Sequence, residues 1–167
     1  MMVAGLFDEF FGVPTHPLAV HAPVVLIPLL AIAAVVVLFR SSWRERASVP
    51  IAGLSVVMVA MLFVAKESGQ AVKASGNVLG NVDRHQDLGN QTFVLSLIWL
   101  VLAVGAAAAL VIGRRNSPRS LSAAVDDGGR LDQVTLVFNV LAMIALVVTT
   151  IWLIRTGHAG AESRWVG

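Results

Sequence analysis

Residues 18–39 read LAVHAPVVLIPLLAIAAVVVLF, a run with no charged side chain. A helix needs about 20 mainly apolar residues to cross the roughly 30 Å hydrocarbon core of a bilayer, and this run is long enough. Three further stretches are similarly apolar: Val49–Ala65, Thr92–Ile112 and Val134–Ile154. The second is the shortest, but a helix can continue from it through residue 74. The sequence therefore predicts four membrane-spanning helices.

The composition supports a membrane protein. Of the residues, 57% are hydrophobic and 13% are charged, whereas soluble domains average about 45–50% and about 25%. A soluble helix bundle would need polar stripes at the helical period, and few polar residues interrupt these runs. We expect a single-domain, all-α, multi-pass four-helix bundle in contact with the lipid bilayer, with spans at about 17–39, 49–74, 85–112 and 131–156. A short interfacial helix is expected at about 5–12.

The charges predict the orientation of the bundle. An up-down-up-down topology places the two connections after spans one and three on one side, where seven basic residues stand against four acidic ones. The other side has five basic and six acidic residues. By the positive-inside rule, both termini and the connection at 66–91 face outward. The seven basic residues are Arg40, Arg44, Arg46, Arg114, Arg115, Arg119 and Arg130.

The residue content also limits the chemistry. The chain has no cysteine, which excludes disulfides, iron–sulfur clusters and covalent c-type haem. The net charge of +2 is not arranged in a basic run with interleaved aromatics, so nucleic acid is not expected as a partner. No nucleophile sits beside a histidine with an orienting acid, which makes a hydrolase the least favoured class.

All four histidines are predicted at the outward end of the bundle. His16 and His21 flank the start of span one, His85 precedes span three, and His158 follows span four. Imidazole is a common ligand of haem iron and of transition metals. The clustering therefore predicts a cofactor or metal site at this end.

We expect His21 and His85 to be the principal ligands. His21 lies about one turn inside span one, where an unpaired polar group is costly, so it should face the bundle interior. The alternative for His21 is a hydrogen bond to a neighbouring backbone carbonyl. His85 lies in the first turn of span three, which Asn81 or Asp83 can cap. In a four-helix bundle, spans one and three are commonly diagonal, so two imidazoles that point inward from them can ligate both faces of one haem. The alternative for His85 is an exposed position in a loop.

The other candidates have secondary roles. His16 is about 140° from His21 on a helix, so it should cap the helix or bind a second group. His158 is expected on a glycine-flanked turn, as a ligand, a gate or a helix cap. Arg84 and Arg155, with Lys73, can bind the anionic propionates of a haem at the rim. Ordinary interfacial anchoring is the alternative for each of these cations.

Three further features concern packing. Pro23 and Pro28 should kink span one. Gly105 and the alanines at 106–109 form a small-residue face that permits close helix contact, and Asn139 should make an interhelical hydrogen bond. The segment 113–130 reads as a solvated loop.

Several motifs resemble those of a bacterial membrane protein family, the domain of unknown function 2231. Residues 16–23, HPLAVHAP, are similar to the family's opening HPLxVHxP signature. The resemblance continues at Ser68-Gly69, at His85-x-x-Leu88-Gly89 and in the glycine-rich end from Gly157. It implies a four-helix protein of the bacterial cytoplasmic (inner) membrane with a redox or haem-linked role.

These observations lead to three functional hypotheses. The first is a b-type haem electron-transfer protein or a subunit of a larger respiratory complex, with haem b held by His21 and His85 and with His158 or His16 as replacements. The second is a copper, zinc or iron site built from three or four of these histidines. The third is a cofactor-free accessory or assembly subunit. The expected protein partners are other membrane redox subunits or further copies of the chain. We expect an electron carrier or an accessory subunit rather than a stand-alone catalyst.

Overall fold

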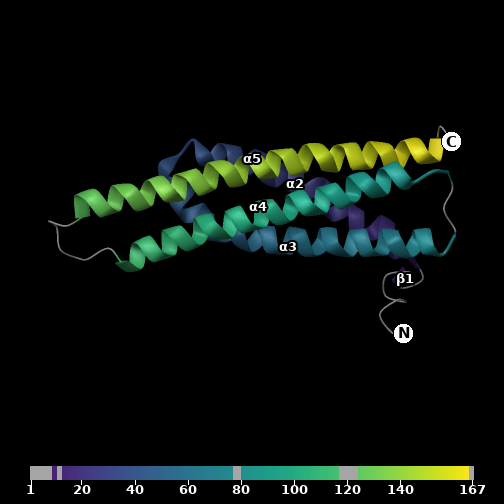
Figure 1. Cartoon of the computed structure of the whole chain (residues 1–167), viewed down its shortest axis with the longest axis horizontal. Helices are drawn as coiled ribbons and strands as arrows, with labels where there is room; N and C mark the ends of the chain where they lie inside the picture. Colours follow the sequence, from purple (N-terminus) through teal and green to yellow (C-terminus); the bar gives the residue numbers. More distant parts are fainter. Residues whose placement is uncertain (1–8, 11–12, 77–79, 117–123, 166–167) are drawn as a thin grey trace.

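Four long helices form one bundle in the computed structural model, which describes residues 9–10, 13–76, 80–116 and 124–165. The helices are α2 (Thr15–Leu38), α3 (Ser41–Ala74), α4 (Asp83–Asn116) and α5 (Ala124–Trp165). Successive helices run in opposite directions, so the start of α2 and the end of α5 lie at the same end of the bundle (Figure 1). The expected all-α, four-helix fold is confirmed.

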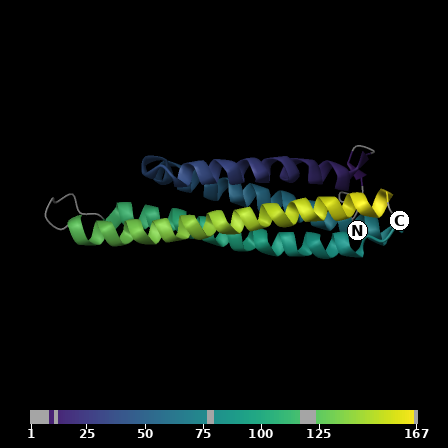
Figure 2. The ribbon, with the colours of Figure 1, turned by 90° about the horizontal axis from the view of Figure 1, so that it is seen from above.

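The four helices pack as the corners of a square. Helix α2 packs against α3 and α5, and α4 packs against the same two helices, most extensively against α5. Helices α2 and α4 are therefore diagonal partners, as are α3 and α5, and the view from above in Figure 2 agrees with this arrangement. Residues at the same end of α2 and α4 face one another across the centre of the bundle.

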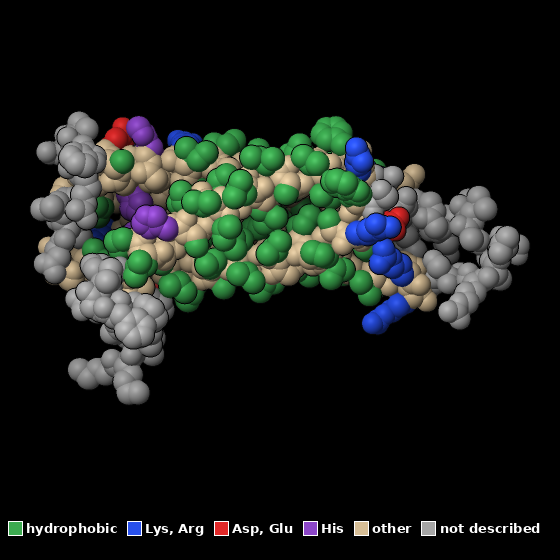
Figure 3. Space-filling view, turned by 180° about the vertical axis from the view of Figure 1, so that it is seen from behind, with side chains coloured by type: hydrophobic (Ala, Val, Ile, Leu, Met, Phe, Trp, Pro, Cys, Tyr) green, Lys and Arg blue, Asp and Glu red, His purple; other side chains and the backbone are tan. Residues whose placement is uncertain are grey.

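The outer surface of the bundle is apolar. Each helix contains a window with a mean hydropathy of 2.3 to 2.6, and at most 33% of such a window is buried within the protein. Large aliphatic side chains such as Ile32 (64% exposed) and Val101 (68% exposed) point outward. These side chains are suited to contact with lipid, because soluble monomers rarely expose continuous apolar surfaces of this size. Figure 3 shows the apolar band between one end with histidines and another with several basic side chains, which are arginines; these are here named the histidine end and the arginine end.

Small side chains allow the helices to approach closely inside the bundle. A Cβ atom on Gly105 of α4 would lie 2.6 Å from Cε1 of Phe138 on α5, so only glycine fits there. Ala103 and Ala106 are 2% and 1% exposed. Asn139 of α5 donates from Nδ2 to Ser48 Oγ of α3 at 3.3 Å. The predicted interhelical hydrogen bond is confirmed. The predicted small-residue face is confirmed at Gly105 and Ala106, whereas Ala108 of the same run is exposed.

Helix ends differ from the predicted spans. Helix α3 begins at Ser41 rather than near 49, α4 continues to Asn116, and α5 runs from Ala124 through Gly157 and Gly160 to Trp165. Arginine and alanine in these flanks are good helix formers once a span has nucleated the helix, although α5 also includes Gly128 and Gly129, which are poor ones. The loop expected at 113–130 is therefore wrong for 113–116 and 124–130, and residues 117–123 lie outside the described part. Helix α2 is continuous through Pro23 and Pro28.

The segment before α2 is extended rather than helical where it is described. Residues Glu9–Phe10 (β1) pair in antiparallel fashion with Val13–Pro14 (β2). The interfacial helix predicted at about 5–12 is therefore wrong for residues 9–10, and the rest of that segment lies outside the described residues. Because β2 leads directly into Thr15, the ladder fixes how the chain enters α2.

Candidate functional site

A cavity of about 350 Å³ lies at the histidine end, and all four helices contribute to its walls. Its size falls within the roughly 300–1,000 Å³ range of small-molecule sites. The apolar lining includes Pro23 of α2, Leu62 of α3 and Leu153 of α5. Two of the four histidines, His16 and His85, line the same cavity. This cavity is the candidate site.

The His16 ring rests on helix α3. Its Nδ1 lies 3.0 Å from the carbonyl oxygen of Ala65 and 3.3 Å from Ser68 Oγ, which itself donates to the Ala65 carbonyl. A carbonyl can only accept, so the Nδ1–H of a neutral His16 donates to Ala65, and the lone pair is on Nε2. A Cβ at Gly69 would lie 3.0 Å from Cε1 of this ring. Glycine at this position leaves room for the imidazole.

The His85 ring rests on helix α5 in the same manner. Its Nδ1 lies 2.8 Å from the carbonyl oxygen of Thr156, and a Cβ at Gly160 would lie 2.9 Å from that nitrogen. In both cases the ring contacts a carbonyl at position i and a glycine at position i+4. The helical partner of that carbonyl is the N–H of the same glycine. The missing side chain therefore opens a path to a carbonyl oxygen that is otherwise covered.

The two rings meet across the bundle. The ring centroids of His16 and His85 are 6.1 Å apart, with their planes at 84°. One ring comes from α2 and the other from α4, the diagonal pair that the sequence was expected to use for a two-ligand site. Both Nδ1 atoms are held by backbone carbonyls, so each neutral ring has Nε2 free to act as a ligand.

His21 does not take part in this arrangement. Its side chain is exposed, and its Nδ1 bonds the carbonyl of Pro17 on its own helix. The prediction that His21 faces the interior is wrong, and the alternative of a backbone hydrogen bond is correct. Five residues correspond to about 140° of rotation, so turning His16 inward turns His21 toward lipid. His16, and not His21, is therefore the α2 histidine that faces His85 across the bundle.

His158 also lies away from the cavity. It sits within α5 rather than on a turn, with 72% of its side chain exposed, and its Nε2 is 3.2 Å from Glu162 Oε1. Arg84 Nη1 lies 3.0 Å from the other oxygen of Glu162, and the Arg155 guanidinium stacks 4.8 Å from the Trp152 ring centre. None of these three predicted site residues lines the cavity. The helix continues past His158 because Gly157 and Gly160 need not end a helix that is packed on its neighbours.

Sequence reasoning missed the residues that hold the rings. The acceptor carbonyls belong to Ala65 and Thr156, and the clearances belong to Gly69 and Gly160. A glycine within a long helical segment, at the same end as a histidine of a neighbouring helix, was the available signal. Within the described ranges, no three side chains of His, Cys, Asp or Glu come close enough to hold one metal ion. The geometry therefore pairs two histidines and does not gather three or four.

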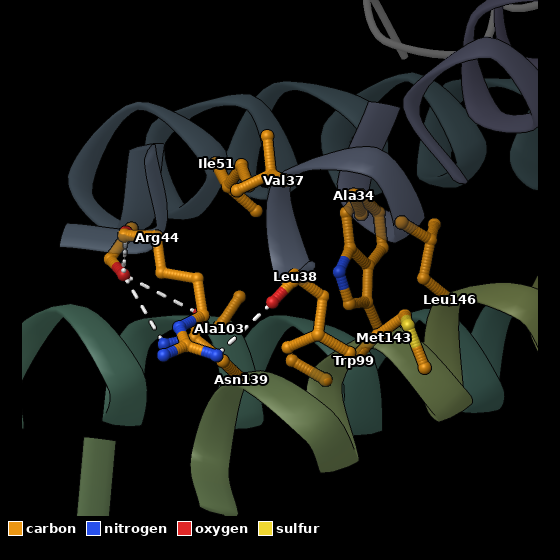
Figure 4. Close-up of a pocket in the computed structure, with 12 residues that line it drawn as sticks. Ala34, Val37, Leu38, Arg44, Ile51, Trp99, Ala103, Asn139, Met143 and Leu146 are labelled. Atoms are coloured by element: carbon orange, nitrogen blue, oxygen red, sulfur yellow. Dashed lines mark hydrogen bonds between the residues drawn. The ribbon is translucent and has the colours of Figure 1, made fainter. Parts of the chain in front are cut away.

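A second, much smaller cavity lies at the arginine end (Figure 4). Its volume is about 20 Å³, which is room for a single water molecule. Arg44 donates from Nη1 to the Leu38 carbonyl at 3.1 Å, which satisfies a carbonyl at the end of α2. Beside it, Ser48 and Asn139 bond each other, and Trp99 packs against the apolar wall. These contacts hold the helix ends together, and the residues that line this small cavity include no recognisable reactive group.

The fold and the cavity define a four-helix membrane protein with a paired-histidine site at one end of the bundle. The sequence matches the model of a family described as a predicted membrane protein, DUF2231, over residues 12–167. The chain belongs to this family. Searches of curated proteins and of solved structures returned no match.

Proposed function

We propose that this membrane protein binds one b-type haem between His16 and His85 and transfers electrons, as a subunit of a larger redox assembly. The observation that carries the proposal is the pair of imidazoles from diagonal helices, each anchored through Nδ1 to a backbone carbonyl. Anchoring of this kind is the usual support of a metal-ligating histidine, because it fixes the tautomer and the ring orientation.

The distance between the rings fits a shared metal centre. Two imidazoles bound to opposite sides of one ion would have centroids roughly 6 Å apart, because each metal–nitrogen bond is about 2 Å and each nitrogen is about 1 Å from its ring centre. The measured separation is 6.1 Å. Zinc sites take three or four protein ligands, whereas a haem supplies four equatorial nitrogens and needs only two axial ligands. A two-histidine donor set in an apolar cavity therefore favours haem over a bare ion.

The protein's own contribution would be orientation, burial and ligand basicity. The carbonyls of Ala65 and Thr156 would increase electron density on the two rings, and the apolar part of the lining would limit contact with water. A bound haem would supply one-electron chemistry. The site lies near one end of the spans, so electrons would be exchanged with a partner on that side of the membrane. With the positive-inside rule, that side is the outer face of a bacterial cytoplasmic membrane.

The test is a dithionite-reduced minus oxidised spectrum of the detergent-purified protein, with and without added haem. We expect a b-type signal that is lost in His16→Ala and in His85→Ala. His21→Ala and His158→Ala are matched controls at the same end, and both should keep the signal. A preparation that stays colourless with added haem contradicts the proposal. So does a signal that depends on His21 and not on His16.

A further inference from the structure

Among Lys, Arg, Asp and Glu, only lysines are found in the described lining of the cavity. The chain contains two lysines, Lys66 and Lys73, and both line the cavity. No aspartate or glutamate is among the described residues that line it. A cavity with two ammonium groups and no acidic side chain favours a ligand with negative charge.

The two lysines flank the His16 clearance on helix α3. Lys66 lies three residues before Gly69 and Lys73 four residues after it, so all three share one helix face. The Lys66 ammonium is 2.8 Å from Glu67 Oε1 and 5.9 Å from the Phe93 ring centre. The Lys73 ammonium is 2.7 Å from Asp83 Oδ1. The cationic wall of the cavity therefore runs along α3 toward the start of α4.

The opposite wall has no charge. Helix α5 contributes Leu153, Thr156, Gly157, Gly160 and Ser163, which are apolar, hydroxylic or without a side chain. A ligand with one apolar edge and one anionic edge would have only one favourable orientation here. Its apolar edge would lie along α5 and its anionic edge along α3.

We infer that the ligand carries two carboxylates and that Lys66 and Lys73 bind them, one each. This inference rests on the proposed haem site: of the cations expected to bind the propionates it keeps Lys73, and it replaces Arg84 and Arg155 by Lys66. The present partners of the lysines do not prevent it. The Glu67 side chain is 30% exposed and that of Asp83 is 69% exposed, and ion pairs near the surface contribute little and exchange readily.

The experiment uses metal-free protoporphyrin IX and its dimethyl ester, titrated into the detergent-purified full chain and followed by porphyrin fluorescence. Both probes lack iron, so binding does not depend on ligation by histidine. We expect the diacid to bind at least about tenfold more tightly than the ester, since each charge-assisted bond changes affinity by about tenfold or more. Lys66→Met and Lys73→Met should each remove about tenfold for the diacid and leave the ester unchanged.

Two sets of variants serve as controls. Lys66→Arg and Lys73→Arg keep the charge and should restore most of the preference for the diacid. Arg155→Met removes a cation at the same end but outside the cavity and should have no effect. Because only two side chains carry an amine, acetylation of the folded protein with an amine-specific reagent gives a second readout, in which the diacid should protect both lysines and the ester should not.

The results separate this inference from the proposed function. Equal binding of the two probes, binding of neither, or a loss that is the same for both in the lysine variants overturns the carboxylate assignment. A preserved preference for the diacid, together with haem binding that is insensitive to His16→Ala and His85→Ala, overturns histidine ligation alone.

Discussion

Replacing Gly160 by alanine is the sharpest perturbation of the site. The new Cβ would lie 2.9 Å from Nδ1 and 3.0 Å from Cε1 of His85. Favourable contacts of this type lie at about 3.5–4.0 Å, so the ring must retreat by roughly 0.5–1 Å. Its hydrogen bond to the Thr156 carbonyl, 2.8 Å long, would stretch to the limit of hydrogen bonding or break.

The effects on stability and on binding should diverge. Loss of the hydrogen bond costs about 1 kcal/mol net, and alanine in place of glycine favours the helix by about 0.8–1 kcal/mol. The two changes nearly cancel, so the free energy of unfolding should change by less than about 1 kcal/mol. Binding should weaken by about 10–100-fold, the usual penalty when a supporting contact of a metal ligand is lost.

Haem titration and thermal unfolding of the same detergent-purified samples test this prediction. Gly53→Ala is the matched control, because a Cβ at Gly53 of α3 meets nothing within 4 Å and this residue does not line the cavity. It should bind haem as the wild type does. If Gly160→Ala also binds haem with unchanged affinity, the His85 ring is not held as described. If it unfolds the protein, the argument from cancelling contributions fails.

Two further predictions concern the packing of the bundle, with the unfolding free energy in detergent as the measurement. Gly105→Ala should destabilise the protein by about 1–3 kcal/mol, the usual cost of overpacking, because the new Cβ would lie 2.6 Å from the Phe138 ring. In the control Gly53→Ala the new Cβ meets nothing within 4 Å, so this variant should be neutral or stabilising. Equal effects of the two variants would contradict the close approach of α4 and α5. Asn139→Ala and Ser48→Ala should each cost about 0.6–1.7 kcal/mol, and the double variant should cost less than their sum because they share one hydrogen bond. Additive losses would indicate that this bond contributes nothing.

The sequence was sufficient to predict the four spans and the end at which the histidines gather. The lengths of the apolar runs and the positions of the charged residues can both be read directly from the sequence. It was not sufficient to choose between His16 and His21, because α2 is apolar on every side and its polarity does not indicate which face turns inward. Side-chain size does not supply the missing information either, because the large Ile27 on the His16 face is buried whereas the small Ala33 is exposed.

The ends of the helices were also predicted less accurately than the spans themselves. The flanks of the spans are polar, and polarity alone does not separate a helix that extends beyond the membrane from a loop. Gly157 and Gly160 were interpreted as a turn, since glycine often ends a helix. At Gly160 the real reason for glycine is the His85 ring against it, a contact with a residue 75 positions earlier in the chain. No local pattern reports such a contact.

The repeated contact between a histidine and a glycine has a consequence for assembly. His16 ties α2 to α3, and His85 ties α4 to α5, so each imidazole closes the hairpin to which it belongs. Each half thus has a histidine contact of its own between its two helices. A group captured between the two rings would clamp the halves together, and its supply would then set how long the finished protein survives.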